Sequence, residues 1–217
     1  MGVQKTLAAF KQEFARTAPE GRVALYESKI AELRVSSLFD GALRTGESVP
    51  DFRLLGAKGN LVSLHDEIAS GPIVVTFYRG GWCPYCNLQL KAYQEILPQI
   101  QSYGAKLIAI SPELPDQYLT TAEQNALAFD VLSDLGNRVA RSFGIVFTLP
   151  EELRAAMIAN GKALPGINGD ESWELPVPAT FVIDTNATAV LAHIDVDYRN
   201  RLEPDEIVAA LKSLSLQ

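Results

Sequence analysis

Hydrophobic residues in the first 45 positions recur every three or four residues, the spacing of one face of an amphipathic helix. Two such stripes are separated by a break at Pro19-Glu20-Gly21, and charged residues fill the other faces. We therefore expect two helices that form an αα-hairpin. Their apolar faces need cover, either from the main domain or from a second copy of the chain. The stripes consist of Val3, Leu7, Phe10 and Phe14, and of Val23, Tyr26, Ile30 and Leu33.

A boundary at residues 46–50 separates this hairpin from a second pattern, in which short apolar runs alternate with helical stripes. Such alternation predicts a mainly parallel sheet that is covered on both faces. Turn residues predict a loop at 56–60 and a hairpin turn at 184–187. Strands are expected at 52–55, 61–64, 73–78, 107–110, 130–132, 179–183 and 190–194, and helices at 65–69, 87–101, 116–125, 137–143, 150–160 and 205–214.

Residues 145–176 interrupt the alternation. After the helix expected at 150–160, the segment 162–176 contains several proline and glycine residues and is typical of a loop. We expect an insertion that crosses the surface near the functional site, in which Trp173 either covers that site or only anchors the loop. The chain is thus divided into an N-terminal helical extension, residues 1–45, and one domain, residues 46–217, with an insertion at about 145–176.

The only two cysteines lie between the strand at 73–78 and the helix that follows it, as Cys83-Pro84-Tyr85-Cys86. This spacing puts both sulfurs at the start of one helix, close enough to form a disulfide after small adjustments. Unpaired backbone N–H groups and the positive end of the helix dipole favour a thiolate there. Such a position lowers a cysteine pKa from roughly 8.5 to about 3.5–7.5. The pattern predicts a reactive, redox-active pair.

Composition and charge exclude several other classes of function. With 217 residues and a net charge of −7, and with no basic run, the chain does not have the clustered cations that nucleic acid requires. A zinc site is not expected, because His65 and His193 do not lie at finger-like spacing from the cysteines. No apolar stretch approaches the ~18 residues of a membrane span, and no secretory signal is evident. We expect a cytoplasmic protein with no metal, no cofactor, and no membrane or nucleic-acid partner.

The order of elements, with a cysteine pair at the first helix of the domain, resembles the thioredoxin superfamily. Within it, residues 46–214 resemble the peroxiredoxin family of alkyl hydroperoxide reductase and thiol-specific antioxidant proteins. The resemblance implies an α/β, thioredoxin-like fold of the peroxiredoxin type, with a central mixed sheet, helices on both faces and an N-terminal helical extension. It is carried by GESVPDFRL at 46–54, VVTFY at 74–78, LIAISP at 107–112, FDVLSDLGNRVARSFGI at 129–145 and FVID at 181–184.

Peroxiredoxins contain the motif Pro-x-x-x-Thr-x-x-Cys, whose cysteine attacks the peroxide. Aligned with it, Cys86 takes the peroxidatic place, Cys83 the threonine place and Arg79 the proline place. The catalytic arginine of the family falls at or beside Pro178. Two companions of the reactive cysteine are therefore missing. Arg79 either supplies a compensating cation or is a surface arginine.

What replaces these residues is similar to thioredoxin. The run from Trp82 to Cys86 resembles its active site, and Val177-Pro178-Ala179-Thr180 resembles the segment whose cis-proline faces the disulfide. We accordingly expect Pro178 to be cis, because it would then present a backbone edge to a substrate sulfur. The residues expected to orient substrate are Pro178, Arg79 and Trp82.

Three hypotheses follow. In the first, the chain is a thiol-dependent peroxidase in which Cys86 attacks a hydroperoxide, Cys83 resolves the sulfenic acid, and a thioredoxin- or glutaredoxin-type reductant restores both thiols. In the second, it is a thiol–disulfide oxidoreductase in which Cys83 attacks a disulfide substrate without significant peroxidase activity. In the third, it is a redox-sensing or interaction module. The N-terminal helices also suggest a homodimer.

Overall fold

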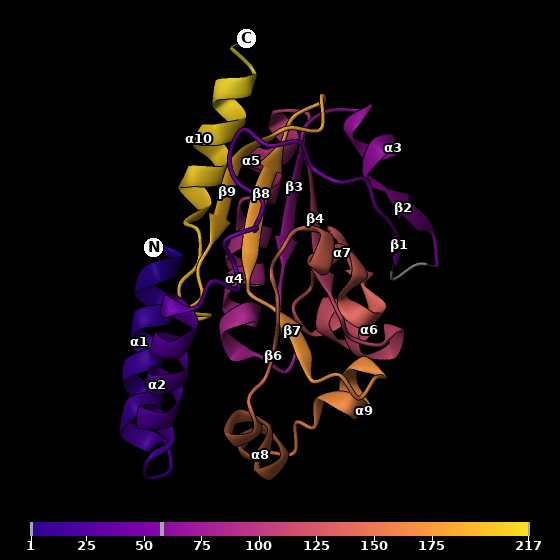
Figure 1. Ribbon diagram of the computed structural model, residues 1–217. Helices are drawn as coiled ribbons and strands as arrows, with labels where there is room; N and C mark the ends of the chain where they lie inside the picture. The colour runs from indigo at the N-terminus through magenta and orange to yellow at the C-terminus, as the bar shows by residue number, and fades with distance from the viewer. Residues whose placement is uncertain (1, 57–58, 217) are drawn as a thin grey trace.

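The central sheet carries the rest of the molecule in the computed structural model, which describes residues 2–56 and 59–216. Its seven strands lie in the order β2-β1-β5-β4-β3-β8-β9 (Figure 1). These strands are β1 Arg53–Gly56, β2 Leu61–Ser63, β3 Ile73–Phe77, β4 Lys106–Ser111, β5 Asp130–Ser133, β8 Ala179–Ile183 and β9 Ala189–Ile194. The helices are α1 Val3–Thr17, α2 Arg22–Val35, α3 Leu64–Ile68, α4 Pro84–Glu95, α5 Leu97–Ser102, α6 Pro115–Gln124, α7 Arg138–Ser142, α8 Glu151–Ala159, α9 Leu164–Asn168 and α10 Pro204–Leu214.

Strand direction in this sheet is mixed. Strand β4 pairs in parallel with β3 and β5, whereas the other four strand pairs are antiparallel. The central mixed sheet implied by the thioredoxin-like resemblance is confirmed. The mainly parallel sheet predicted from the alternation is wrong, because an apolar pattern reports that a strand is buried but not which way an edge strand runs.

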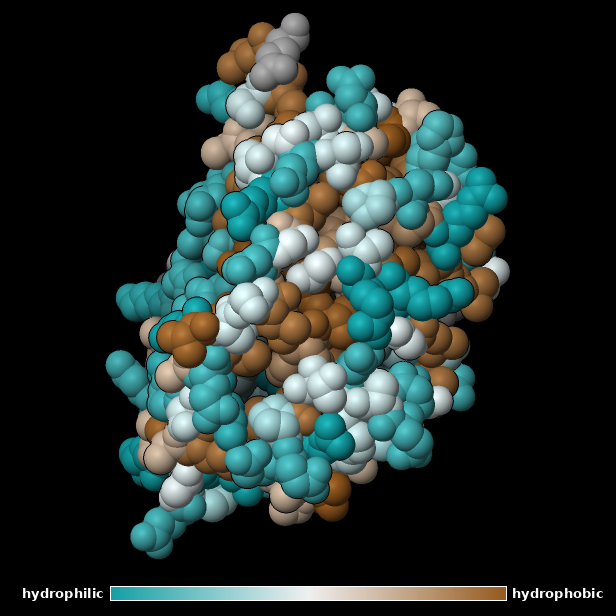
Figure 2. All heavy atoms as spheres, viewed as in Figure 1, coloured by the Kyte–Doolittle hydropathy of each residue, from teal (hydrophilic) through white to brown (hydrophobic). Residues whose placement is uncertain are grey.

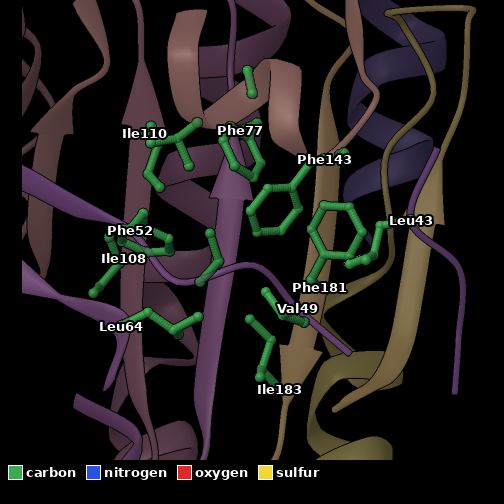
Figure 3. Close-up of a cluster of buried hydrophobic side chains, with 14 of the residues drawn as sticks. Leu43, Val49, Phe52, Leu64, Phe77, Ile108, Ile110, Phe143, Phe181 and Ile183 are labelled. Atoms are coloured by element: carbon green, nitrogen blue, oxygen red, sulfur yellow. The ribbon is translucent and has the colours of Figure 1, made fainter. Parts of the chain in front are cut away.

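The β3 strand is buried on both faces, which explains its uninterrupted apolar run. Ile73, Val75 and Phe77 point into one cluster, where Phe143 and Phe181 pack against Phe77 (Figure 3). Successive strand residues point to opposite faces of a sheet, so the intervening Val74 lies in a second cluster. That cluster also contains residues of α4, α5 and α10. The helix expected at 87–101 is split into α4 and α5 at Ile96, and Pro98, which has no backbone N–H to donate, lies in the first turn of α5.

The two N-terminal helices form the predicted hairpin along one side of the domain (Figure 1). Val3 and Leu7 of α1 are buried in the same cluster as Tyr85 and Cys86 of α4, and α2 contacts α8. Cover for their apolar faces therefore comes from the same chain. Figure 2 shows the molecule in space-filling form from the viewpoint of Figure 1. Hydrophilic side chains occupy most of the outline, and hydrophobic ones gather near the middle.

The expected loop at 162–176 is only partly a loop. It contains α9 and a strand, β7 Glu174–Pro176, which pairs with β6 Val146–Thr148 in a separate two-stranded sheet. Pro165 lies in the first turn of α9 and Gly169 ends it in the left-handed conformation, so these residues bound a short helix. The backbone oxygen of Trp173 accepts a hydrogen bond from Leu149 N–H at 2.9 Å, which anchors the loop. Of the turn expected at 56–60, residues 57–58 lie outside the described residues.

Candidate active site

The loop that connects β3 to α4 contains two adjacent glycines, Gly80 and Gly81. A side chain at Gly80, whose φ is +137°, would come within 2.8 Å of the carboxylate of Glu113, and one at Gly81 would collide with Thr121. With no side chain in the way, Gly81 N–H donates to both carboxylate oxygens of Glu113, at 3.0 and 2.9 Å. This close approach fixes the chain just before the cysteine pair.

Cys83 and Cys86 both lie at the first turn of α4, as predicted. Cys83 is the N-cap residue and Pro84 takes the first helical position, where the missing N–H of proline costs nothing. Both cysteines are reduced and buried. A thiol hydrogen bond joins the two sulfurs, so disulfide formation requires little movement.

The two thiols differ sharply in acidity. Burial opposes ionisation of Cys83, but the S–H group of Cys86 and the guanidinium groups of Arg79 and Arg201 outweigh it and lower the pKa of Cys83 to about 5. Burial raises the pKa of Cys86, and its hydrogen bond to the Cys83 thiolate raises it further. One proton is thus shared by the pair, with the thiolate on Cys83.

Arg201 is the functional residue that sequence reasoning missed. It lies in the segment between β9 and α10, is only 2% exposed, and donates from Nη2 to the sulfur of Cys86 at 3.5 Å. Its Nη1 donates to the backbone oxygens of Tyr198 and Asn200. A buried cation in contact with the cysteine pair therefore exists, although position 178 lacks the arginine of the family motif.

Hydrogen bonds from the N-terminal hairpin hold the segment that carries Arg201. The side-chain amide of Gln4 donates to the backbone oxygen of Arg201. The carboxylate of Glu203 accepts hydrogen bonds from the backbone N–H groups of Val3 and Gln4, at 2.9 and 3.0 Å. These are the first residues of α1, where the helix dipole favours a negative charge. The start of α1 thus fixes both sides of Arg201.

Arg79 is buried and is not a surface residue. Its guanidinium group lies between two aromatic rings, 4.8 Å from the centre of Trp82 and 4.2 Å from that of Tyr198. The ammonium group of Lys162 donates to the backbone oxygen of Trp82 at 3.0 Å. Arg79 and Trp82 are therefore brought together beside Cys83, and their role towards substrate stays a prediction.

Pro178 also lies in this region, but not in the expected conformation. A cavity of about 170 Å³ is lined by both Pro178 and Cys83. The backbone has no cis peptide bond in residues 2–56 and 59–216, so the expectation of a cis Pro178 is wrong. Trans is the favoured isomer of an X–Pro bond, and here the chain continues directly into β8 at Ala179.

Glu113 is a second ionisable group that the sequence did not point out. It is 2% exposed. Burial raises its pKa to about 7, against the opposing effect of the Gly81 N–H group. Sequence offered no signal for it beyond its place just after β4. A group that titrates near neutral pH beside a redox pair is available to hold a proton.

Other kinds of site receive no support from the described residues. Among them, no group of three or more His, Cys, Asp or Glu side chains is placed to hold a metal ion, His65 and His193 included. None of the helices in the described ranges combines the length and apolar character needed to cross a membrane.

Comparison with known proteins agrees with the resemblance seen in the sequence. The model of the AhpC/TSA family matches residues 45–191. A chloroplastic peroxiredoxin Q of Sedum lineare is 28% identical over 193 residues, covering 87% of this chain and 88% of the relative. Another, from Gentiana triflora, is 29% identical over 161 residues, covering 74% of this chain and 61% of the relative.

Solved structures give the same fold. The crystal structure of the peroxidoxin BcpB from Mycobacterium tuberculosis superposes with a TM-score of 0.63 at 22% identity, covering 79% of this chain and 98% of that one. A cysteine-to-serine mutant of Xylella fastidiosa PrxQ gives a TM-score of 0.62 at 14% identity, covering 79% and 97%. The predicted thioredoxin-like fold of the peroxiredoxin type is confirmed.

Proposed function

This chain belongs to the AhpC/TSA family and is a thiol-dependent peroxidase, and we propose that Cys83 and Cys86 carry out its reaction. The observation on which this proposal depends is the pair itself: two reduced, buried thiols in one helical turn, with Arg201 donating to one sulfur and the pKa of the other lowered. Two cations and a helix N-terminus favour the thiolate, which is the nucleophilic form.

The first step oxidises a single sulfur. The thiolate of Cys83 attacks the terminal oxygen of a hydroperoxide, so that an S–O bond forms and the O–O bond breaks. The departing alkoxide takes a proton and leaves as an alcohol, and Cys83 becomes a sulfenic acid. Arg79 and Arg201 stabilise the negative charge that moves from sulfur to oxygen, as fixed donors do at other sites of charge transfer.

The second step closes the disulfide and prepares for recycling. The sulfur of Cys86 attacks the sulfenic sulfur of Cys83, an S–S bond forms, and water leaves. A dithiol reductant of the thioredoxin or glutaredoxin type then reduces the disulfide by exchange and is itself oxidised. We assign to Glu113, whose pKa is near 7, the role of taking the proton that Cys86 must lose before it can attack.

This order of attack reverses the one that alignment with the family motif predicts, in which Cys86 attacks first. Two observations support Cys83: its pKa is the lowered one, and it lines the cavity through which a substrate reaches the pair. Cys86, by contrast, is not among the residues that line this cavity, and its pKa is raised. The thiol–disulfide oxidoreductase hypothesis shares this nucleophile, but the peroxiredoxin relatives do not favour it.

The test uses the two single cysteine variants. Reaction with one equivalent of hydroperoxide should give a sulfenic acid on Cys83 in the Cys86→Ser protein, detected by dimedone labelling and mass spectrometry. Cys83→Ser should give neither label nor turnover with a thioredoxin-type donor. A label on Cys86 in Cys83→Ser, with peroxide consumption retained, would restore the order given by the motif. No oxidation in either variant would overturn the assignment of the pair.

The finer properties of the protein belong to the same proposal. We expect a thioredoxin- or glutaredoxin-type protein as the source of electrons, a possible homodimer, and the cytoplasm as the compartment. Val3 and Leu7 of α1 and Ile30 of α2 are buried on their own domain, so we expect a dimer to use another surface. Sedimentation velocity at several concentrations checks this point.

A further inference from the structure

We propose that the cavity beside Cys83 binds the apolar part of a bulky organic hydroperoxide, and that the N-terminal hairpin provides the wall that selects it. The inference rests on the proposed function, since Cys83 is the attacking sulfur. It goes beyond that function because α1 and α2 lie outside residues 45–191, the region that the family model matches. Substrate preference would thus come from an addition to the family fold.

The cavity has a volume of about 170 Å³, with Cys83 among its lining residues. Most of its walls are aromatic or aliphatic, and they come from opposite sides. The hairpin contributes one side and α8 the other, through Phe10, Phe14, Tyr26, Leu33, Leu153 and Met157. Pockets for small molecules in general have this composition, with a few polar groups that fix orientation.

Aromatic contacts hold the hairpin wall in place. The rings of Phe14 and Tyr26 stack across the two helices, with centroids 5.8 Å apart and planes 4° from parallel. Phe10 meets the edge of Tyr85, beside the cysteines, at 4.9 Å. Such contacts add to the stability that apolar burial provides. The wall is therefore preformed and needs no ligand to assemble it.

A few polar groups line the cavity, and two of them, Arg79 and Lys162, lie near Trp82 at its cysteine end, whereas Lys29 and Asn160 lie on α2 and just after α8. Arg79 and Lys162 both line it, and the Nε atom of Arg79 is buried with no hydrogen-bond partner in the described structure. A hydroperoxide matches this distribution, because its O–O–H group is polar and its organic group is not. Hydrogen peroxide has no apolar surface with which to gain from the walls.

The test compares cumene hydroperoxide with hydrogen peroxide by the ratio of their kcat/KM values. Wild type should favour the organic peroxide by at least about tenfold, the discrimination that a small apolar difference gives in a hydrophobic pocket. That ratio should fall about tenfold in Phe14→Ala and in Leu153→Ala, which shorten opposite walls. The controls are Val35→Ala, on the second helix of the hairpin, and Ile158→Ala, on α8; these side chains are 88% and 55% exposed, and both variants should keep the wild-type ratio. Equal ratios in all five proteins would overturn the proposal.

A binding measurement separates this proposal from the peroxidase assignment. Cumyl alcohol, which carries the same organic group without the peroxide, should slow alkylation of Cys83 by iodoacetamide in wild type, and much less in Phe14→Ala. Protection without any peroxide turnover would overturn the peroxidase assignment and leave the apolar site standing. Turnover of both peroxides with no protection and no discrimination would overturn the site and leave the peroxidase.

Discussion

The apolar cluster around Phe77 and the neighbouring cluster that holds the cysteines are equally withdrawn from water, yet only the cysteine cluster contains ionisable groups. Phe77, Phe143 and Phe181 form the centre of the core and are each 0% exposed (Figure 3). In the cysteine site, Cys86 and Arg201 are also buried. Burial in the core contributes stability, whereas burial around the cysteines changes acidity.

The three buried arginines near the cysteines differ in whether a carboxylate pairs with them. Arg199, which is buried as well, is paired with two carboxylates, Glu27 and Asp197. Neither Arg79 nor Arg201 forms an ion pair with a carboxylate in the described part of the chain, and the Nε atom of each is buried without a partner. A Cys83 thiolate provides the missing negative charge. A buried cation without a counter-ion destabilises a fold, so its presence here indicates a chemical use.

The largest effect is expected from a cavity in the core. Phe143→Ala should lower the free energy of unfolding by about 3–5 kcal/mol, because both the transfer energy and the packing of a buried ring are lost. Urea denaturation measures this change. The pKa of Cys83 in the folded variant should stay as in wild type. A loss below about 1 kcal/mol, or a shifted thiol titration, would show that the two regions are not separate.

The next effect is expected at Arg201. Arg201→Gln should reduce kcat/KM for hydroperoxide about 100-fold, the usual cost of removing one donor from a site of developing charge, and should raise the pKa of Cys83. Arg201→Lys should recover part of both. The thiol pKa is read from the pH dependence of iodoacetamide labelling.

Arg199→Gln is the matched control for this prediction. It breaks ion pairs to Glu27 and Asp197 and should cost stability, but should move the thiol pKa less than Arg201→Gln does. Equal shifts in the two variants would mean that Arg201 acts only by supporting the loop.

A third effect concerns pH. The pKa of Glu113 is raised to about 7 in the folded protein from an ordinary 4.5, so the folded state holds this proton more tightly than the unfolded state. Its stabilising contribution is complete below pH 4.5 and is lost as pH rises through 7, a change of up to about 3 kcal/mol. Glu113→Gln should lack this slope. Parallel stability curves for the two proteins between pH 4.5 and 8 would contradict the prediction.

The smallest effect is expected where the hairpin meets Arg201. Glu203→Gln removes the charge that accepts hydrogen bonds from Val3 and Gln4, and should cost about 1 kcal/mol or less. Hydrogen exchange of the α1 amides should become faster, while that of the β3 amides should not. Unchanged exchange in α1 would show that this contact does not hold the hairpin.

Sequence reasoning succeeded where a local signal fitted only one structure. The strand at 73–78, the cysteine pair and the helix after it are consecutive, so period and turn residues place Cys83 and Cys86 at one helix start. The hairpin at 1–45 was predicted for the same reason. The short helix α9 was missed because Pro165 and Gly169 fit both a loop and the two ends of a five-residue helix.

Arg201 was missed because it lies 115 residues from the cysteine that it contacts and belongs to no recognisable motif. The pairing of β8 with β3 and β9 could have indicated its position. Ala179 pairs with both Phe77 and Ile194, so β9 ends at the edge of the sheet where β3 ends. A predicted hairpin, combined with an antiparallel β8, would have placed the segment after residue 194 beside the cysteines.

The placement of both sulfurs at the first turn of α4 affects how readily peroxide would inactivate the enzyme. A sulfenic acid that must wait for a distant thiol is exposed to a second peroxide molecule, which oxidises it to a sulfinic acid that ordinary thiols do not reduce. Here the second thiol is already hydrogen-bonded to the first, and no unwinding has to come before closure. Resistance to inactivation by excess oxidant is thus inherent in the three-residue spacing.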